Sequence, residues 1–383
     1  MNELAVCTII TKSYLPYART LASSLAEHNP GITLYVLLAD RVDGYFDPSL
    51  ENFKFIYLED LFHAEEIDRM CFYYTAFELC CALRGVLHEY MFDKTNIRKW
   101  IFLDSDIMIF SPLDVIFEQL ETTSILLTPH NSIIPIDDKY IASCEISFLK
   151  CGLYNAGFLG LNRTNTSKEF IGWFKNRLKN FAFDDSTNQE SMSRGLFVDQ
   201  LWLNLVPLYF KEVKYCLEPG ANLGYWNFFD RTLTKDSSGS IRVNEEPVIF
   251  IHFSGWDINN PNAVSKYSSI YDEKNPNYWL EISETYKDNL LENGYSICAE
   301  FPYAFKCFHD GKSILLKMRR QYYNFIRRGK NLPYSPFSNE YYSRLKLTFA
   351  YTNLLKKIPI LGLVVNVFKA KIMTIRESKF LDR

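Results

Sequence analysis

The stretch Trp100-Ile-Phe-Leu-Asp104-Ser-Asp106-Ile-Met-Ile-Phe110 decides how the rest of this chain is interpreted. An apolar run ends in two aspartates, and a second apolar run follows them directly. Residues i and i+2 of extended backbone point to the same side, so both carboxylates can reach one object. Two ionised carboxylates repel each other unless a cation lies between them, and their oxygens suit Mn²⁺ or Mg²⁺. The pattern indicates a metal site, with a solvated Asp-Ser-Asp turn as the alternative.

Short apolar runs alternate with longer amphipathic stretches around this segment. This alternation predicts an α/β domain with a mostly parallel central sheet flanked by helices, and ligands of such sheets bind at the carboxyl ends of the strands. The expected strands are Leu4–Thr11, Ile32–Ala39, Lys54–Leu58, Lys99–Leu103, Ser124–Thr128, Leu153–Leu161 and Glu246–Phe253. The expected helices are Tyr14–His28, Phe72–Tyr90, Lys168–Phe181 and a short helix that starts near Asp199.

His252 ends another apolar strand, in Val248-Ile-Phe-Ile-His252-Phe-Ser-Gly255. A neutral imidazole there would complete a ligand set with Asp104 and Asp106. Gly255 permits close approach of the backbone to a ligand. The alternative is a core histidine that bonds a backbone carbonyl.

Three polar residues occupy or follow the next apolar segments. Asn155 lies within a strand that also contains Gly157, and a glycine inside a strand often marks the close approach of another group. The amide could bond sugar hydroxyls, or it could bond backbone at a bulge. Asp199 is placed to cap a helix, which would explain it structurally, whereas Gln200 has no such explanation.

Together these motifs resemble the retaining glycosyltransferases of the GT-A (nucleotide-diphospho-sugar transferase) fold. The closest class is glycosyltransferase family 8, which holds bacterial lipopolysaccharide galactosyl- and glucosyltransferases and glycogenin. The resemblance covers roughly residues 4 to 256, and it rests on the order of Asp104-Ser-Asp106, Asn155-Ala-Gly157, Asp199-Gln200 and His252.

The resemblance implies a role for each matching position. It implies that Asp104, Asp106 and His252 hold Mn²⁺ (or Mg²⁺) on the diphosphate of a nucleotide-sugar donor, with UDP-hexose as the expected donor. It implies that the donor sugar is surrounded by Asn155, Asp199 and Gln200, the catalytic candidates. The donor-binding candidates are Thr11 and Tyr14 against the base, Arg84 towards phosphate or sugar, Ser105 between the aspartates, and Gly255. A plain surface arginine is the alternative for Arg84.

One departure concerns the phosphate-binding part of the site. Family members carry a lysine a few residues after the His-x-x-Gly segment, whereas the first lysine here is Lys266. Either Lys266 belongs to a mobile loop or another group compensates. The segment 219–227, with Trp226, is expected to form a wall of the donor or acceptor site, with a core position as the alternative for the tryptophan.

Charge divides the chain into two parts. The net charge of -3 suggests no polyanionic partner such as nucleic acid, but residues 311–383 carry 16 Lys and Arg against 3 Asp and Glu. We expect a catalytic domain over 1–277 and a helical, basic, aromatic-rich appendage over 278–383. The appendage could bind an anionic membrane surface, which would suit a lipid-linked acceptor, or it could pack on the domain or mediate oligomerisation.

The nine scattered cysteines form no CxxC pair and indicate a reduced compartment. The N-terminus shows no export signal, and no run of about 18 apolar residues occurs. The expected location is therefore the cytoplasm, where the chain could also associate peripherally with the inner face of the membrane.

Two rival functions remain beside glycosyl transfer. A metal-dependent nucleotidyltransferase or phosphohydrolase could use the same aspartates, but a glycine-rich basic loop after the first strand is missing. A non-catalytic carbohydrate-binding protein would keep the aromatic residues but has no need of a buried Asp/Asp/His set.

Overall fold

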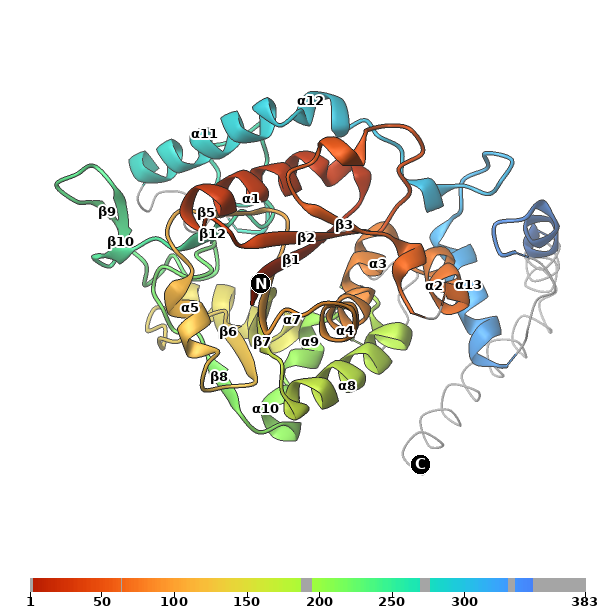
Figure 1. The fold of residues 1–383 in the computed structure, drawn as a ribbon, viewed down its shortest axis with the longest axis horizontal. Helices are drawn as coiled ribbons and strands as arrows, with labels where there is room; N and C mark the ends of the chain where they lie inside the picture. Colours follow the sequence, from red (N-terminus) through yellow and green to blue (C-terminus); the bar gives the residue numbers. More distant parts are fainter. Residues whose placement is uncertain (1–2, 63, 187–194, 269–275, 330–334, 347–383) are drawn as a thin grey trace. The chain divides into compact units, whose positions relative to one another are not determined.

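The computed structural model describes residues 3–62, 64–186, 195–268, 276–329 and 335–346. The chain divides into two compact units, Met1–Phe305 and Lys306–Arg383, and each is described by itself. The first unit contains the seven-stranded sheet of Figure 1, in the order β3-β2-β1-β4-β7-β6-β8. Its strands are β1 (Leu4–Ile10), β2 (Thr33–Leu38), β3 (Lys54–Ile56), β4 (Lys99–Leu103), β6 (Ile125–Pro129), β7 (Tyr154–Asn162) and β8 (Val213–Tyr215).

Strand direction confirms the expected α/β class with a mostly parallel sheet. β3, β2, β1 and β4 run parallel to one another, and β8 runs parallel to β6. Within this sheet only β7 is antiparallel to its neighbours, β4 and β6. The carboxyl ends of β1, β2, β4 and β6 therefore meet at one edge, where ligands of such sheets bind.

Helices cover both faces of the sheet, and β4 at its centre shows how. Its five residues are all buried, and successive side chains point to opposite faces. Trp100 Nε1 donates a hydrogen bond to His88 of α4 (Arg84–Lys94) at 3.1 Å. Ile101 and Leu103 instead join the apolar core with α1 (Leu15–His28). Figure 1 shows α1 on one side of the sheet, with α4 and α8 (Asn165–Phe181) on the other.

The single helix expected over Phe72–Tyr90 is wrong, because the chain forms three helices there. These are α2 (Ala64–Tyr73), α3 (Ala76–Ala82) and α4. Thr75 caps α3: its hydroxyl accepts from the Glu78 N–H at 3.3 Å, and the Glu78 carboxylate accepts from the Thr75 N–H at 2.9 Å. This reciprocal pair satisfies N–H groups that a continuous helix would bond internally. The second break, at Leu83, makes Arg84 the first residue of α4.

Gly85 allows α4 to lie directly against α8. A Cβ at this position would stand 2.5 Å from the Lys175 Cα, a backbone atom that side-chain rotation cannot move. We expect Gly85→Ala to force the two helices apart and to lower the free energy of unfolding by about 1–3 kcal/mol. Thermal and urea unfolding would measure the change, and an unfolding midpoint equal to that of the wild type would contradict this packing.

Two smaller sheets complete the first unit. β5 (Ile107–Ile109) pairs antiparallel with β12 (Phe250–His252), while β9 (Leu233–Lys235), β10 (Ile241–Val243) and β11 (Glu246–Pro247) form a three-stranded sheet. The expected strand Glu246–Phe253 is thus divided between two sheets. Asp236 accepts from the N–H groups of Ser238 and Ser240, which stabilises the turn between β9 and β10.

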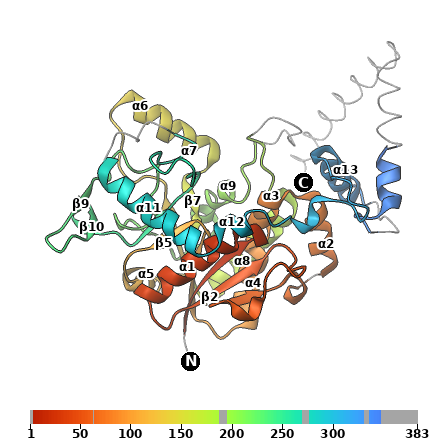
Figure 2. The same cartoon turned by 90° about the horizontal axis from the view of Figure 1, so that it is seen from above.

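α11 (Pro276–Glu292) and α12 (Tyr295–Cys298) lie beside α1 (Figures 1 and 2). Both helices belong to the first unit, so the contacts place the division after Phe305, later than the expected boundary after residue 277. The remaining short elements are η1 (Lys12–Tyr14), η2 (Pro48–Leu50), η3 (Leu58–Asp60), α5 (Asp114–Gln119), α6 (Asp138–Tyr140), η4 (Ile141–Glu145), α7 (Ile146–Cys151), α9 (Gln200–Leu203), α10 (Val206–Tyr209) and η5 (Ala304–Lys306).

The second unit is built around α13 (Leu316–Arg327). Arg319 and Arg320 of this helix are buried. Lys356, Lys357 and the apolar segment 358–368, on which the expectation of membrane binding also rests, lie outside the described residues. Among the residues that the structure describes, no helix combines the length and the apolar character needed to cross a membrane.

Candidate metal and donor site

Strand pairing brings Asp104, Asp106 and His252 to one place. Asp104 directly follows β4 and Asp106 directly precedes β5. β12 pairs with β5 so that His252 lies opposite Ile107, and the Phe253 N–H donates to the Asp106 carbonyl at 2.9 Å. The expected proximity of the imidazole to the two carboxylates is therefore a consequence of the antiparallel β5–β12 register.

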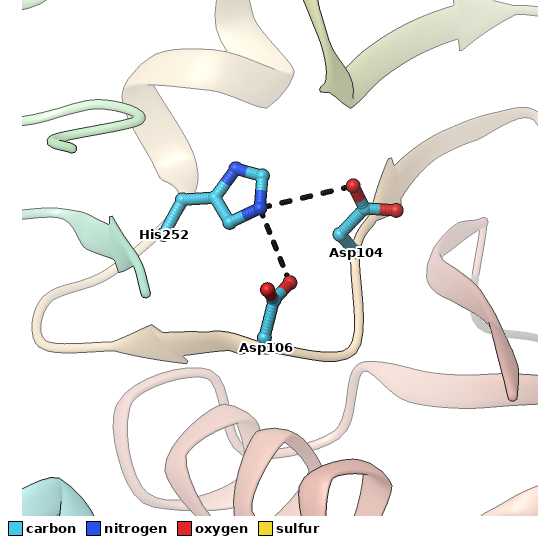
Figure 3. Close-up of side chains that lie close together, drawn as sticks. All are labelled: Asp104, Asp106 and His252. Atoms are coloured by element: carbon cyan, nitrogen blue, oxygen red, sulfur yellow. Dashed lines mark ion pairs between the residues drawn. The ribbon is translucent and has the colours of Figure 1, made fainter. Parts of the chain in front are cut away.

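The three side chains converge as a cation site requires (Figure 3). His252 Nε2 lies 3.1 Å from Asp106 Oδ1 and 3.8 Å from Asp104 Oδ2. The three possible ligand atoms all lie within 4.8 Å of one another. Two carboxylate oxygens and one imidazole nitrogen fit a divalent cation that keeps open positions for water or a diphosphate, and the nitrogen ligand suits Mn²⁺.

The pKa values of these groups show that the site favours positive charge. Burial raises the pKa of Asp104 to about 6, against the opposing effects of Arg84 and His252. Burial acts in the same direction on Asp106, but the charge and hydrogen bond of His252 outweigh it, so the pKa of Asp106 is lowered. Burial acts to lower the pKa of His252, but the two aspartates outweigh it and the pKa is raised.

Arg84 is not a surface arginine. Its Nη2 donates to Asp104 Oδ1 at 2.5 Å and its Nη1 donates to Asp199 Oδ2 at 2.7 Å. Burial disfavours its charge, but the two carboxylates outweigh this effect and the pKa of Arg84 is raised. Asp199 occupies the N-cap position of α9, yet its side chain makes no capping hydrogen bond. The capping explanation for Asp199 therefore fails, because its carboxylate is committed to Arg84.

The other two catalytic candidates lie next to this pair. Asn155 is near the start of β7, and Gln200, the first residue of α9, contacts that strand. Gln200 Oε1 accepts from the Ala156 N–H at 3.0 Å, and its Nε2 donates to the Cys151 carbonyl at 2.9 Å. Asn155 is also buried, and its Oδ1 accepts from the Gly157 N–H at 3.0 Å. Backbone contacts thus fix both amides, while each NH₂ group retains a second N–H.

The donor-binding candidates lie on both sides of the metal ligands. Tyr14 is 47% exposed and stacks on Tyr17 with 4.7 Å between ring centroids. Desolvation and the nearby Asp106 raise the pKa of Tyr14 to about 12, which places its hydroxyl in the field of the carboxylates. Thr11 is buried, with its hydroxyl 3.1 Å from that of Ser13, and Ser105 is buried between the aspartates.

Gly255 and Lys266 meet beside the strand that ends in His252. The backbone of Gly255 has φ +69°, and a Cβ there would stand 2.4 Å from the Tyr267 ring. This ring alone accounts for the glycine, without an approaching ligand. The Lys266 N–H donates to the Gly255 carbonyl at 2.9 Å. The chain therefore brings Lys266 back to the His-x-x-Gly segment although the two are far apart in sequence.

Sequence reasoning missed His130, whereas Asn222 and Trp226 belong to the segment 219–227 that it expected to line the site. His130, immediately after β6, lies 3.2 Å from Asn155 through its Nε2, and Asn222 donates to Asn155 Oδ1 at 3.2 Å. Trp226 is buried and contacts the His252 ring edge-on, at 5.2 Å between centroids. His130 follows an apolar strand just as Asp104 does, and this position could have identified it in the sequence as a candidate site residue.

No family model matches the chain. In sequence it is 24% identical over 278 residues to the uncharacterized protein YfnF of Bacillus subtilis strain 168, covering 68% of this chain and 84% of that protein. It is also 24% identical over 261 residues to the uncharacterized protein YfnD of the same organism, covering 67% of this chain and 79% of that protein.

The solved structures that it resembles are glycosyltransferases. They include the galactosyltransferase LgtC in complex with donor and acceptor sugar analogues, with 17% identity, coverage of 73% of this chain and 95% of that one, and a TM-score of 0.44. GlyE of Streptococcus pneumoniae TIGR4 has 18% identity, coverage of 80% and 67%, and a TM-score of 0.42. Values this low do not assign the chain to a family, so its function is argued from the site.

Proposed function

We propose that the chain is a metal-dependent, retaining glycosyltransferase of the GT-A type, similar to family 8. It would move a hexose from a nucleotide sugar, with UDP-hexose as the expected donor, to a glycan or lipid-linked acceptor in the synthesis of bacterial-type surface polysaccharide. The observation that best supports this proposal is the convergence of Asp104, Asp106 and His252. Arg84 hydrogen-bonds both to Asp104 of this cluster and to Asp199, the residue that precedes Gln200.

The chemistry follows from the charge of the leaving group. When the bond from the anomeric carbon to the diphosphate breaks, negative charge develops on a phosphate oxygen. A bound divalent cation supplies Lewis-acid stabilisation of that charge. Asp104, Asp106 and His252 would hold this cation, while Arg84 orients Asp104 by a hydrogen bond of 2.5 Å. Lys266 would add positive charge from the far side of the His-x-x-Gly segment.

The donor sugar would lie against Asn155, Asp199 and Gln200, with attack of the acceptor hydroxyl on the face that the leaving group vacates. This geometry retains the configuration at the anomeric carbon. NMR of the product linkage tests the point, because an inverted anomeric centre would exclude the retaining mechanism.

A panel of nucleotide sugars, incubated with Mn²⁺, Mg²⁺ or EDTA, tests the proposed function. Without acceptor, we expect metal-dependent hydrolysis of one donor to free sugar and nucleoside diphosphate. Addition of acceptor should accelerate release of the diphosphate, with the sugar recovered on the acceptor. Release of nucleoside monophosphate and sugar 1-phosphate instead would indicate a nucleotidyltransferase or phosphohydrolase. Saturable sugar binding without turnover of any donor would indicate a non-catalytic carbohydrate-binding protein.

We further propose that residues 1–277 carry catalysis and that the basic region from 311 onward contacts an anionic membrane surface from the cytoplasmic side. The excess of Lys and Arg in that region supports the proposal. Co-sedimentation of the whole chain with vesicles of phosphatidylserine and phosphatidylcholine tests it. Equal recovery with vesicles of phosphatidylcholine alone would contradict an electrostatic attachment.

A further inference from the structure

His130 is a buried histidine that neither the metal nor the donor site uses. It is 4% exposed, and burial lowers its pKa to about 4, so the ring is neutral near pH 7. Its ring is stacked on Phe148, with centroids 4.8 Å apart, and meets Trp226 edge-on at 5.6 Å. Its Nε2 lies 3.2 Å from Asn155 Nδ2. Because an amide NH₂ only donates, this nitrogen of His130 accepts and the ring proton is on Nδ1.

The opposite end of the Asn155 amide is also defined. Its oxygen accepts from the Gly157 N–H at 3.0 Å and from Asn222 Nδ2 at 3.2 Å. If the amide were reversed, its NH₂ group would face these two donors, and its oxygen would face the Nε2 acceptor of His130. The Gly157 N–H therefore selects this orientation of Asn155, and His130 with its proton on Nδ1 supplies the matching acceptor on the other side.

This orientation matters to His252. The Nε2 of His252 faces the two carboxylates, so a bound metal would leave the ring proton on Nδ1. That Nδ1 is buried and has no hydrogen-bond partner among the residues that the structure describes. Metal-binding histidines almost always donate their second N–H to an acceptor. A Cβ on Gly157 would stand 2.5 Å from this Nδ1 and 2.8 Å from Asn155 Oδ1, so both atoms border the space that the absent side chain leaves.

We propose that His130 is a positioning residue for the metal site: it fixes the Asn155 amide so that the oxygen faces the Nδ1–H of His252. The inference rests on the metal dependence proposed above. His130 contacts Asn155, both Asn155 and His252 border the same position beside Gly157, and Trp226 packs against both imidazoles. Asn155 retains one N–H for a sugar hydroxyl, so this role is compatible with its place beside the donor.

The test measures affinity for Mn²⁺ alone, without donor, from the loss of the free-ion EPR signal on titration. His130→Leu removes the acceptor for Asn155 Nδ2, and we expect Mn²⁺ affinity to fall by about 10–100-fold, the usual effect of losing a partner of a metal-binding histidine. His130→Gln offers an amide oxygen to the same NH₂ group and should stay within about threefold of the wild type. Circular dichroism and thermal unfolding in EDTA establish that each variant is folded.

A double variant separates positioning from simple packing. In His130→Leu with Asn155→Asp, a carboxylate presents oxygens on both sides and needs no partner to orient it. We expect this double variant to bind Mn²⁺ at least about threefold more tightly than the sum of the separate effects of His130→Leu and Asn155→Asp gives, a coupling that independent structural losses would not produce.

Wild-type affinity in folded His130→Leu, or a double variant no better than the sum of the two separate effects, would overturn the inference and leave the proposed function standing. Absence of Mn²⁺ binding by the wild-type chain would instead remove the proposed metal dependence itself.

Discussion

Asp106→Asn should lower kcat/KM for metal-dependent donor turnover by at least about 10³-fold. The substitution keeps the shape of the side chain but removes one of the two negative charges that face His252 Nε2. Asp104 cannot compensate, because its Oδ1 is already held by Arg84 at 2.5 Å. Loss of a cation that stabilises the leaving group removes several kcal/mol of transition-state stabilisation, and about 1.4 kcal/mol corresponds to each factor of ten.

Two measurements together check this expectation. Turnover of the active donor gives kcat/KM, and thermal unfolding with and without Mn²⁺ shows whether the folded protein still binds the ion, since a ligand of the native state raises the unfolding temperature. Asp114→Asn is the matched control, because Asp114 is exposed on α5. A folded Asp106→Asn protein with turnover within about tenfold of the wild type would exclude Asp106 as a metal ligand.

The strands and helices of the sheet domain could be predicted in their order along the chain, because local patterns of apolar residues were sufficient to identify them. Lys99–Leu103 was predicted with the bounds that the structure shows, since Trp100–Leu103 form the continuous apolar run of a strand buried on both faces. The helix after β1 was predicted from the spacing of Leu15, Ala18, Leu21, Ala22 and Leu25, all of which are buried. The break at Thr75 was missed although Thr75 and Glu78 have the spacing of a capping box, because the apolar periodicity continues through it.

The three candidate metal ligands could also be predicted from the sequence, because each ends or begins an apolar run. The partners of Asp199 and Asn155 could not, since these contacts depend on tertiary structure. Asp199 has a complete local explanation as a helix cap, and only the folded chain shows its carboxylate 2.7 Å from Arg84. Lys266 returns to Gly255 through a loop whose path no periodicity predicts.

Gly157 is the residue whose substitution should damage the site most without changing any polar group. A Cβ there would stand 2.3 Å from His252 Cε1, and it would also crowd Asn155 Oδ1 at 2.8 Å. The backbone of β7 is held between β4 and β6, so the imidazole must move. Displacement of a catalytic group by about 1 Å can cost about 10²-fold in rate. We therefore expect Gly157→Ala to lower kcat/KM by about 10²-fold and to weaken Mn²⁺ binding.

Two glycine controls separate this effect from a general loss of stability. Gly160→Ala lies in the same strand, where the nearest atom is Leu126 Cβ at 3.1 Å, and it should affect stability with little change in Mn²⁺ affinity. Gly172→Ala, in α8, meets no atom within 4 Å and should stabilise the helix by roughly 0.5–1 kcal/mol. If Gly157→Ala bound Mn²⁺ as tightly as Gly160→Ala does, the position of the imidazole would not limit metal binding, and the cation would have to be held by the two carboxylates alone.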